Sequence, residues 1–153
     1  MNFVETINRS AFILTEGAVI ERLNREFKTP ERCTPMTTSD PFLKFFQILN
    51  ERDLEAANVL LDPRAEFFFP KTKPIIGKER ILKFLKIFFR GYPKLVFTVI
   101  RVIHMGDQAA VHWTDRGVNR QKEPYENEGV TLLELKEGKI IMISDFFKNT
   151  EKW

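Results

Sequence analysis

A single aspartate near the end of the chain stands among apolar residues. In the segment KIIMISDFF, the two-residue period of a strand places Asp145 on one face with Ile141, Ile143 and Phe147. The other face is also apolar, so both faces of this strand are expected to be covered. Burying a carboxylate costs free energy unless it is hydrogen-bonded or lies at the mouth of a cavity. Asp145 therefore points most directly to a functional site.

Two earlier segments predict strands that each turn one face inward. In QAAVHWTDRGV, Trp113 and Asp115 share a face with small apolar residues. In the segment from Tyr125 to Leu135, Tyr125 and Asn127 share a face with Gly129, while glutamates occupy much of the other face. We expect these faces to line one cavity together with Asp145. Two further aromatic residues are expected nearby, Phe67 and Phe69.

These residue types suit proton transfer without a metal or a cofactor. Asp145 in an apolar cavity is expected to have a raised pKa and to move protons at neutral pH. Tyr125 and Asn127 are predicted to donate hydrogen bonds to a carbonyl or a developing enolate. The chemistry would be proton transfer next to a carbonyl, hydration, dehydration or cyclisation. The residues predicted to bind the substrate are Trp113, Asp115, Phe67 and Phe69.

Several of these residues also have a purely structural interpretation. Trp113 would serve equally well as a core residue, because large aromatic side chains fill a cavity as readily as they line it. Tyr125 and Asn127 follow Pro124 and would then only complete a turn. Asp115 stands beside Arg116, which is also typical of an exposed strand end.

The composition excludes several classes of protein. The 153 residues contain 43% hydrophobic residues and carry a net charge of only +3, which does not indicate a nucleic-acid partner. No apolar run approaches the roughly 20 residues of a membrane span, and the start lacks a signal-peptide pattern. We therefore expect a cytoplasmic protein without a membrane partner. Cys33 is alone and there are two histidines, too few for a thiolate cluster or an imidazole metal site.

Phenylalanine is unusually frequent, with 15 residues in the chain. Its side chain buries a large apolar area and offers no polar group. Such a content suggests an apolar core, an apolar cavity or a buried oligomer face, and composition alone does not distinguish these three.

The predicted elements divide the chain into an arm and one domain. Residues 1–38 contain an amphipathic helix that stops near Thr29-Pro30, followed by a connector rich in Pro and Thr. This arm is expected to pack on its own domain or on a partner subunit. Residues 39–153 predict two helices, the second ending at Asp62-Pro63, then a strand, a helix and four strands. Helices followed by a run of antiparallel strands predict an α+β fold with a curved sheet.

Five segments in order carry a resemblance to a known family. They are PIIG leading into a helix, PKLVFTV, GDQAAVHW, the pair Tyr125-x-Asn127 and EGKIIMISDFF. Together they resemble the SnoaL-like branch of the nuclear transport factor 2-like superfamily, which is related to ketosteroid isomerases, limonene epoxide hydrolases and polyketide cyclases. The resemblance runs from about Pro41 to Asn149.

The resemblance implies a cone-shaped fold and a pocket. A strongly bent, mostly antiparallel sheet would wrap around helices and leave an apolar pocket open at one end, often in a homodimer. The last strand of the family commonly carries a catalytic or ligand-orienting acid before an aromatic pair, and Asp145 before Phe146-Phe147 matches that position. Lys148 stands where the family usually has a further acid.

Two functions remain open at this point. The first is a cofactor-independent isomerase, hydratase, dehydratase or cyclase acting on an apolar carbonyl compound, with Asp145 moving the proton. The second is a dimeric assembly module, or a binding module that holds an apolar small molecule without turning it over. Lys148 in place of an acid favours the second function, whereas Asp145 together with Tyr125 and Asn127 favours the first.

Overall fold

The structure, a computed structural model, describes residues 40–150. The predicted arm over residues 1–38 lies outside these residues. No helix within residues 40–150 combines the length and the apolar character needed to cross a membrane. The elements in chain order are α2 (Pro41–Glu51), α3 (Leu54–Leu60), β1 (Leu61–Phe68), β2 (Ile75–Ile76), α4 (Lys78–Gly91), β3 (Val96–Met105), β4 (Gln108–Val118), β5 (Pro124–Lys136) and β6 (Lys139–Phe147).

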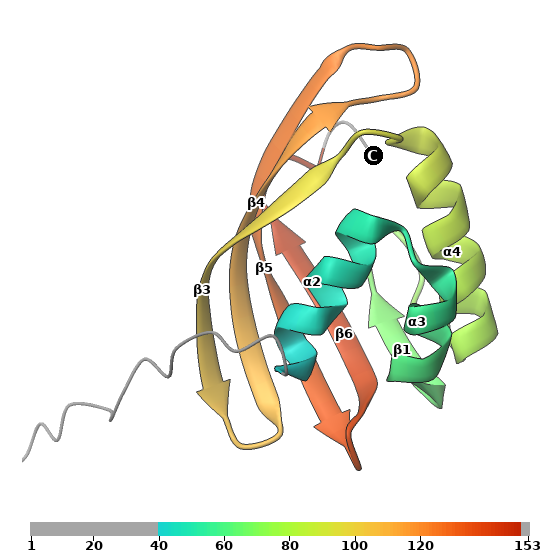
Figure 1. Cartoon of the computed structure of the whole chain (residues 1–153), viewed down its shortest axis with the longest axis vertical. Coiled ribbons are helices and arrows are strands. Elements are labelled where there is room, and N and C mark those ends of the chain that lie inside the picture. The colour runs from blue at the N-terminus through green and yellow to red at the C-terminus, as the bar shows by residue number, and fades with distance from the viewer. Residues whose placement is uncertain (1–39, 151–153) are drawn as a thin grey trace, which may run out of the picture. The chain divides into compact units, whose positions relative to one another are not determined.

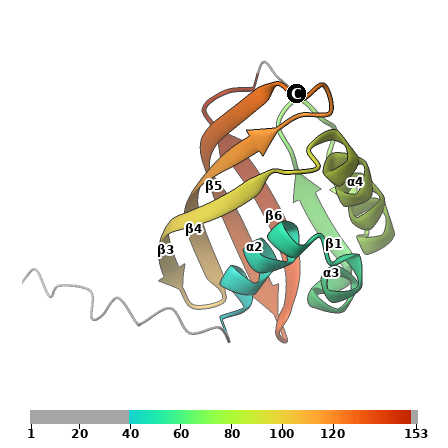
Figure 2. The same ribbon diagram turned by 45° about the horizontal axis from the view of Figure 1, so that its top comes forward.

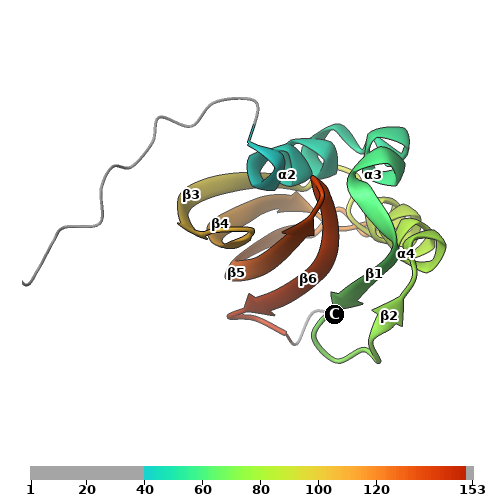
Figure 3. The same cartoon turned by 90° about the horizontal axis from the view of Figure 1, so that it is seen from below.

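The six strands form one strongly bent sheet in the order β2-β1-β6-β5-β4-β3. All neighbouring strands are antiparallel except β1 and β6, which are parallel. The sheet curves around α2, and α3 and α4 lie beside β1 on the same inner side (Figures 1 and 3). Seen from above, α2 lies between β3 and β1 (Figure 2). The predicted α+β fold with a bent, mostly antiparallel sheet around helices is confirmed.

Local sequence signals explain where α2 and α3 begin. The Asp40 side chain accepts a hydrogen bond from the Phe42 backbone N–H at 2.9 Å, and Pro41 occupies the first turn of α2. Asp53 caps α3 in the same way through the Ala56 N–H, also at 2.9 Å. On α2 the apolar stripe is buried against the sheet, as its helical spacing predicts.

The predicted end of the second helix at Asp62-Pro63 is wrong. Helix α3 ends at Leu60, and Leu61 already belongs to β1, where it pairs with Ile140 of β6. Leu61 is buried, so its pairing and burial in the sheet outweigh the local helical pattern. The short strand β2, which pairs with β1, was also not predicted.

One side chain fastens α2 to the edge strand β3. Asn50 donates from Nδ2 to the Phe97 carbonyl at 2.9 Å and accepts from the Phe97 N–H at 2.7 Å. The Asn50 amide thus forms hydrogen bonds with the N–H and the carbonyl of Phe97, which have no neighbouring strand on that edge of the sheet. Arg52, in a left-handed conformation with φ 59°, donates to the carbonyl of Leu95 at 3.1 Å. These contacts hold the end of α2 against the start of β3.

A shift in register changes which residues of β6 face inward. The β5–β6 pairing shifts between Glu134 and Leu135, where one extra residue of β6 is inserted. Ile140 and Ile143 are both fully buried, so the expectation that Ile141 shares the inner face with Ile143 is wrong. Beyond the shift the predicted inner face is correct. The expectation that both faces of β6 are covered is also wrong within the described residues, because Phe146 on the outer face is 58% exposed.

Candidate functional site

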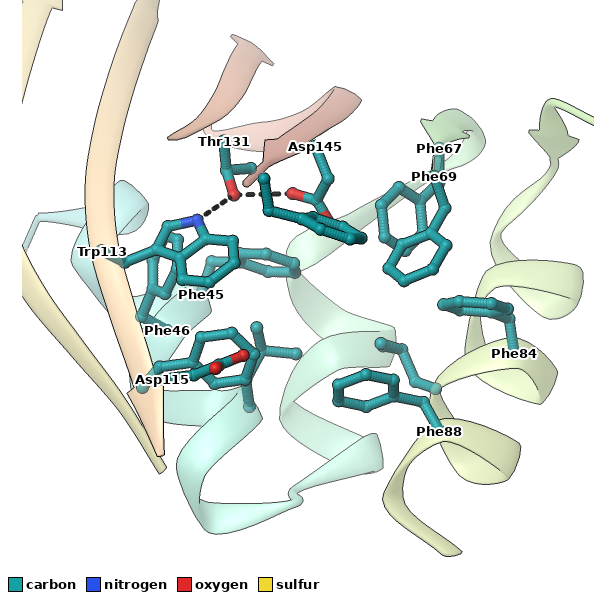
Figure 4. Close-up of a pocket in the computed structure, with 14 residues that line it drawn as sticks. Phe45, Phe46, Phe67, Phe69, Phe84, Phe88, Trp113, Asp115, Thr131 and Asp145 are labelled. Atoms are coloured by element: carbon teal, nitrogen blue, oxygen red, sulfur yellow. Dashed lines mark hydrogen bonds between the residues drawn. The ribbon is translucent and has the colours of Figure 1, made fainter. Parts of the chain in front are cut away.

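A small cavity lies between the inner face of the sheet and helices α2 and α4 (Figure 4). Its free volume is about 30 Å³, and nine of its fourteen lining residues are aromatic. The polar residues that line it are Asp115, Thr131 and Asp145. The cavity is therefore an aromatic enclosure with two carboxyl groups and one hydroxyl group in its wall.

Asp145 is held by a chain of hydrogen bonds that starts at an indole. Trp113 donates from Nε1 to the Thr131 hydroxyl at 2.8 Å, and that hydroxyl donates to Asp145 Oδ1 at 2.6 Å (Figure 4). Thr131 and Asp145 are directly paired across β5 and β6, which brings the two side chains to the same face. Among the described residues, Oδ2 has no hydrogen-bond partner. Burial raises the pKa of Asp145 to about 7, and the hydrogen bond from Thr131 opposes part of that rise.

Asp115 lines the same cavity from β4 and is only 3% exposed. Its carboxyl accepts a hydrogen bond from the Asn127 backbone, but its Oδ1 is buried without a partner among the described residues. Burial raises the pKa of Asp115 to about 7, and the Asn127 hydrogen bond opposes part of that rise. The alternative reading of Asp115 as an exposed strand end beside Arg116 is therefore wrong.

Trp113 is buried and also lines the cavity. It is therefore both a core residue and a residue of the predicted site. Its ring lies over Gly129 of β5: a Cβ added at Gly129 would come within 2.7 Å of the indole Cζ2. A glycine opposite Trp113 in the ladder therefore makes room for the indole. Phe97 meets the indole edge-on with a centroid distance of 5.2 Å.

Phe67 and Phe69 lie in the cavity wall, where they were expected. Their rings meet edge-on at 5.7 Å, and Phe69 contacts Phe147 at 5.4 Å. Phe84 of α4 packs on Phe69 at 5.0 Å and closes the same side of the cavity. These contacts surround the enclosure with ring edges and ring faces.

The structure does not bring Tyr125 and Asn127 to this cavity, so the expected convergence is wrong for these two residues. Asn127 donates to the Tyr125 hydroxyl at 3.0 Å and to the Asn149 carbonyl at 2.8 Å. It also accepts the Asn149 N–H at 3.0 Å. The Asn127 amide is thus occupied in tying the segment after β6 to β5. Tyr125 is buried against Tyr92, with the ring centroids 4.8 Å apart.

Lys148 does not enter the cavity either. It lies on the outer side and donates to Glu128 Oε2 at 2.6 Å, and His112 Nε2 lies 2.9 Å from Glu128 Oε1. These partners lower the pKa of Glu128. The lysine that replaces the usual family acid therefore adds no positive charge beside Asp145.

Thr131 is the residue that sequence reasoning missed as a candidate. The two-residue period places it on the inner face, but its partner across β5 and β6 depends on the shift in register. Without the extra residue in β6, the turn at Glu137-Gly138 would set Thr131 opposite Ser144 rather than Asp145. The aromatic residues contributed by α2 and α4 were likewise not predicted to line the site: Phe45, Phe46, Phe84 and Phe88.

Within residues 40–150, no group of three or more His, Cys, Asp or Glu side chains gathers closely enough to hold a metal ion. The arrangement of the cavity offers instead a proton acceptor in an apolar enclosure. A carboxyl group with a pKa near 7 is well suited to both accepting and donating a proton at neutral pH.

Solved structures of low sequence identity share this fold. A protein of Jannaschia sp. assigned as a SnoaL-like polyketide cyclase is 21% identical with a TM-score of 0.67, covering 77% of this chain and 91% of its own. An NTF2-like protein of unknown function from Burkholderia pseudomallei is 15% identical with a TM-score of 0.67, covering 73% and 91%.

A third similar structure, from Catenulispora acidiphila, is a hypothetical protein with a ketosteroid isomerase-like fold in complex with trimethylamine. It is 15% identical with a TM-score of 0.65, covering 72% of this chain and 86% of its own. No curated protein matches this chain.

The sequence model of the SnoaL-like domain matches residues 42–143, which include α2 and all six strands up to the middle of β6. This match spans well over half of the chain and agrees with the bent sheet and its inner helices. The chain belongs to the SnoaL-like domain family, and its fold is similar to that of the solved NTF2-like and ketosteroid isomerase-like structures.

Proposed function

We propose that this protein binds a small apolar carbonyl compound and catalyses a cofactor-independent proton transfer, of the isomerase, hydratase, dehydratase or cyclase type, with Asp145 as the proton shuttle. The observation that carries the proposal is the Asp145 carboxyl group in the aromatic cavity. One of its oxygens is fixed by Thr131 at 2.6 Å, and the other is free of hydrogen bonds to described residues. The proposed setting is the cytoplasm, as the sequence suggests.

The chemistry follows from the environment of that carboxyl group. With a pKa of about 7, Asp145 is ionised in a substantial share of molecules at neutral pH. The ionised form takes a proton from the carbon next to the substrate carbonyl and returns it to another atom of the same substrate. Thr131 holds Oδ1 throughout, which fixes the orientation of the attacking oxygen. The surrounding rings exclude water and strengthen the electrostatic interactions within the site.

Two of the similar structures support a small-molecule function. The Jannaschia protein is assigned as a polyketide cyclase, and the Catenulispora protein is bound to trimethylamine, a compound with four non-hydrogen atoms. The free volume of about 30 Å³ holds little more than one water molecule. Binding of an organic substrate therefore requires the phenylalanine rings to move apart.

The test is proton exchange at carbon. Small ketones and enones are incubated with the protein in D₂O, and deuterium incorporation next to the carbonyl is followed by NMR. We expect Asp145→Asn to slow the exchange about 10²- to 10⁴-fold, the usual contribution of a positioned base. Asp107→Asn is the matched control, because Asp107 is exposed and carries the same chemical change. Equal exchange by the native protein and Asp145→Asn would remove Asp145 from the mechanism.

The alternative is a dimeric binding or assembly module, and one observation favours the dimer in particular. Register pairs align Ile103, Leu132 and Phe68 in one row across the outer face of the sheet, with Ala110 and Ser144 between them. Their exposed fractions are 61%, 39% and 37%, and that of Phe146 in the adjacent row is 58%. An exposed apolar patch of this kind marks an interaction surface.

We propose that a second copy of the chain covers this outer face. Both signs of charge occur on the same face, as in the Arg116–Glu126 pair at 3.5 Å and the Lys148–Glu128 pair. Two copies related by a twofold axis can therefore meet there without a block of like charges on both sides. Such a dimer leaves the inner cavity of each copy intact, so it is compatible with catalysis and with simple binding.

Sedimentation velocity tests the dimer. We expect the native protein to sediment as a dimer at micromolar concentration and Phe146→Glu to sediment as a monomer, because a carboxylate would be buried in the contact. Ile87→Glu is the control, because Ile87 is 60% exposed on α4, away from the outer sheet face, and this variant should remain dimeric. A native protein that is monomeric at high concentration would contradict the proposed pairing.

A further inference from the structure

The proton-transfer chemistry of Asp145 leaves the second carboxyl group of the cavity unexplained. Asp115 is 3% exposed, and its Oδ1 is buried without a hydrogen-bond partner among the described residues. An unpaired buried carboxyl oxygen costs free energy whether the group is ionised or protonated. Native proteins retain an unpaired buried carboxyl group when a bound water, ion or ligand compensates it. A ligand in the cavity would lie beside the Asp115 carboxyl group and could compensate it.

No positive charge of the protein lines this cavity. Its fourteen lining residues include two aspartates and no Lys, Arg or His. The titratable groups near Asp115 include Asp145 in the same cavity and Tyr92, whose pKa is raised by burial and by the Asp115 charge. Asp115 also borders a second hollow, whose charged lining residues are Arg116, Glu126, Glu128 and Lys148. The site thus has two acids, and neither is balanced by a basic side chain in the cavity wall.

The rest of the wall is made of aromatic rings. Phe97 is the direct cross-strand neighbour of Asp115, and it contacts Phe46 at 6.0 Å, Phe88 at 6.4 Å and Trp113 at 5.2 Å between centroids. Figure 4 shows the Asp115 carboxyl group on the same side of the cavity as Phe46 and Trp113. Aromatic faces attract cations through their quadrupoles, and aromatic cages of this type bind alkylammonium groups.

We propose that the ligand of this site carries a small tertiary or quaternary ammonium group that pairs with Asp115 and rests against the surrounding aromatic rings. This inference depends on the ligand-binding half of the proposed function and not on proton transfer. A tertiary ammonium can donate its N–H to the unpaired Oδ1 of Asp115, whereas a quaternary ammonium compensates the ionised carboxyl group by its charge alone. Both need a counter-charge and ring faces. The cavity supplies both, but its free volume of about 30 Å³ holds little more than one water molecule, so the phenylalanine rings must move apart to admit the head group.

An ammonium group also fits the chemistry at Asp145. The side chains of Tyr125 and Asn127 do not line the cavity, so they do not donate hydrogen bonds to an enolate there. A positive charge within the substrate makes a neighbouring C–H more acidic and offsets the negative charge of the enolate that forms. The substrate class is therefore a small amino ketone or a related compound, with its cation near Asp115 and its acidic C–H near Asp145.

Binding of a cation and of its neutral isostere tests the proposal. The probes are choline and 3,3-dimethylbutan-1-ol, in which carbon replaces the charged nitrogen without a change of shape. Neither contains a carbonyl, so titration calorimetry with them reports on binding alone. We expect the native protein to bind choline about tenfold or more tightly than the alcohol. Equal affinity for the two probes, or no binding of choline, would overturn the proposal.

Variants identify the group responsible. Asp115→Asn should abolish the preference for choline while the affinity for the alcohol stays the same, and Asp107→Asn should keep the preference. Phe97→Leu keeps an apolar side chain but removes a ring, so it should reduce choline binding several-fold. This variant tests the proposal if Asp115→Asn does not fold. A preference for choline that survives Asp115→Asn would also overturn the proposal.

The pH dependence gives a further readout in the native protein. Choline pairs with the ionised form of Asp115, whose pKa is about 7, so its affinity should increase between pH 6 and pH 8. Binding at pH 6 should release protons, which calorimetry in buffers of different ionisation enthalpy detects. The ammonium proposal and the proton-transfer proposal can fail separately. If the protein exchanges deuterium into neutral ketones but does not bind choline, Asp145 remains the base and the ammonium proposal is wrong.

Discussion

At the scale of residues, the properties of the site depend on which hydrogen bond reaches which carboxyl group. Asp145 and Asp115 are both in the cavity wall, and burial raises the pKa of each to about 7. Asp145 accepts from a side chain that is itself fixed by Trp113, whereas Asp115 accepts from the backbone. A hydroxyl donor can be removed by mutation without touching the main chain. The two acids can therefore be tuned separately.

Thr131→Val is predicted to raise the pKa of Asp145 further. The substitution keeps the shape but removes the donor that stabilises the ionised carboxyl group, which is worth roughly one pKa unit or somewhat more. The midpoint of the acidic limb of the pH–rate profile for deuterium exchange, where the rate rises as Asp145 ionises, should move to higher pH accordingly. Carbon NMR of the labelled carboxyl group measures the same shift directly. Thr131→Ser retains the hydroxyl and is the matched control; identical midpoints for the Val and Ser variants would contradict the assignment.

At the scale of elements, the polar residues of the cavity come from three neighbouring strands, β4, β5 and β6. Trp113, Gly129 and Phe147 form one row across these strands. Gly129, at the centre of this row, has no side chain, so the indole of Trp113 can lie over the backbone of β5. The direction of the indole N–H toward Thr131 follows from that position. The hydrogen bonds at Asp145 thus depend on a glycine that touches neither carboxyl group.

Gly129→Ala is predicted to destabilise the protein and displace Trp113. The new Cβ would lie 2.5 Å from the Phe146 carbonyl oxygen and 2.7 Å from the Trp113 ring, distances that force a shift. Overpacking of this type costs about 1–3 kcal/mol of unfolding free energy. Urea denaturation and the tryptophan emission spectrum measure the two effects.

The control for this prediction is Gly91→Ala, where an added Cβ meets nothing within 4 Å. That variant should be close to neutral. Combining Gly129→Ala with Trp113→Phe should restore part of the lost stability, because the smaller ring vacates some of the space. A strictly additive loss in the double variant would show that the clash with the indole is not the cause.

At the scale of the whole domain, the two buried acids couple folding to pH. In the unfolded chain their pKa values return to about 3.8, whereas both are about 7 in the folded protein. Between about pH 4 and pH 7 the folded protein therefore binds protons that the unfolded chain has released. Stability should fall as pH rises through this window, by at most about 1.4 kcal/mol per pH unit for each group. Above about pH 7 the full loss is present.

Urea denaturation at pH 5, 6 and 7 measures this dependence, and Asp115→Asn should make the fall with pH less steep. Asp107→Asn should keep the native slope. Glu128 acts in the opposite sense, but its pKa is lowered from 4.5, so its contribution is lost only as the pH falls below about that value. If the unfolding free energy changes with pH equally in the native protein and in Asp115→Asn, Asp115 is not protonated in the folded protein at pH 6.

Local patterns in the sequence were sufficient for most of the elements and for the direction of several side chains. Asp40 and Asp53 cap the two helices through hydrogen bonds to residues within the next turn, and the two-residue period correctly predicted that Trp113, Asp115 and Asp145 face the interior. These features depend on neighbours within a few residues along the chain, so they can be read without knowing the fold. The same patterns carried the resemblance to the SnoaL-like family.

Contacts between distant segments decided the rest. The extra residue in β6 set Thr131 opposite Asp145, and the position of Asn149 determined that Asn127 ties down the end of β6 rather than facing the cavity. The packing of α2 and α4 brought their phenylalanines around the two acids. A strand period determines which face a side chain occupies, but only the register between strands and the seating of helices determine what it meets there. The sequence by itself therefore determined the fold and the inward acids, while the tertiary structure decided their partners.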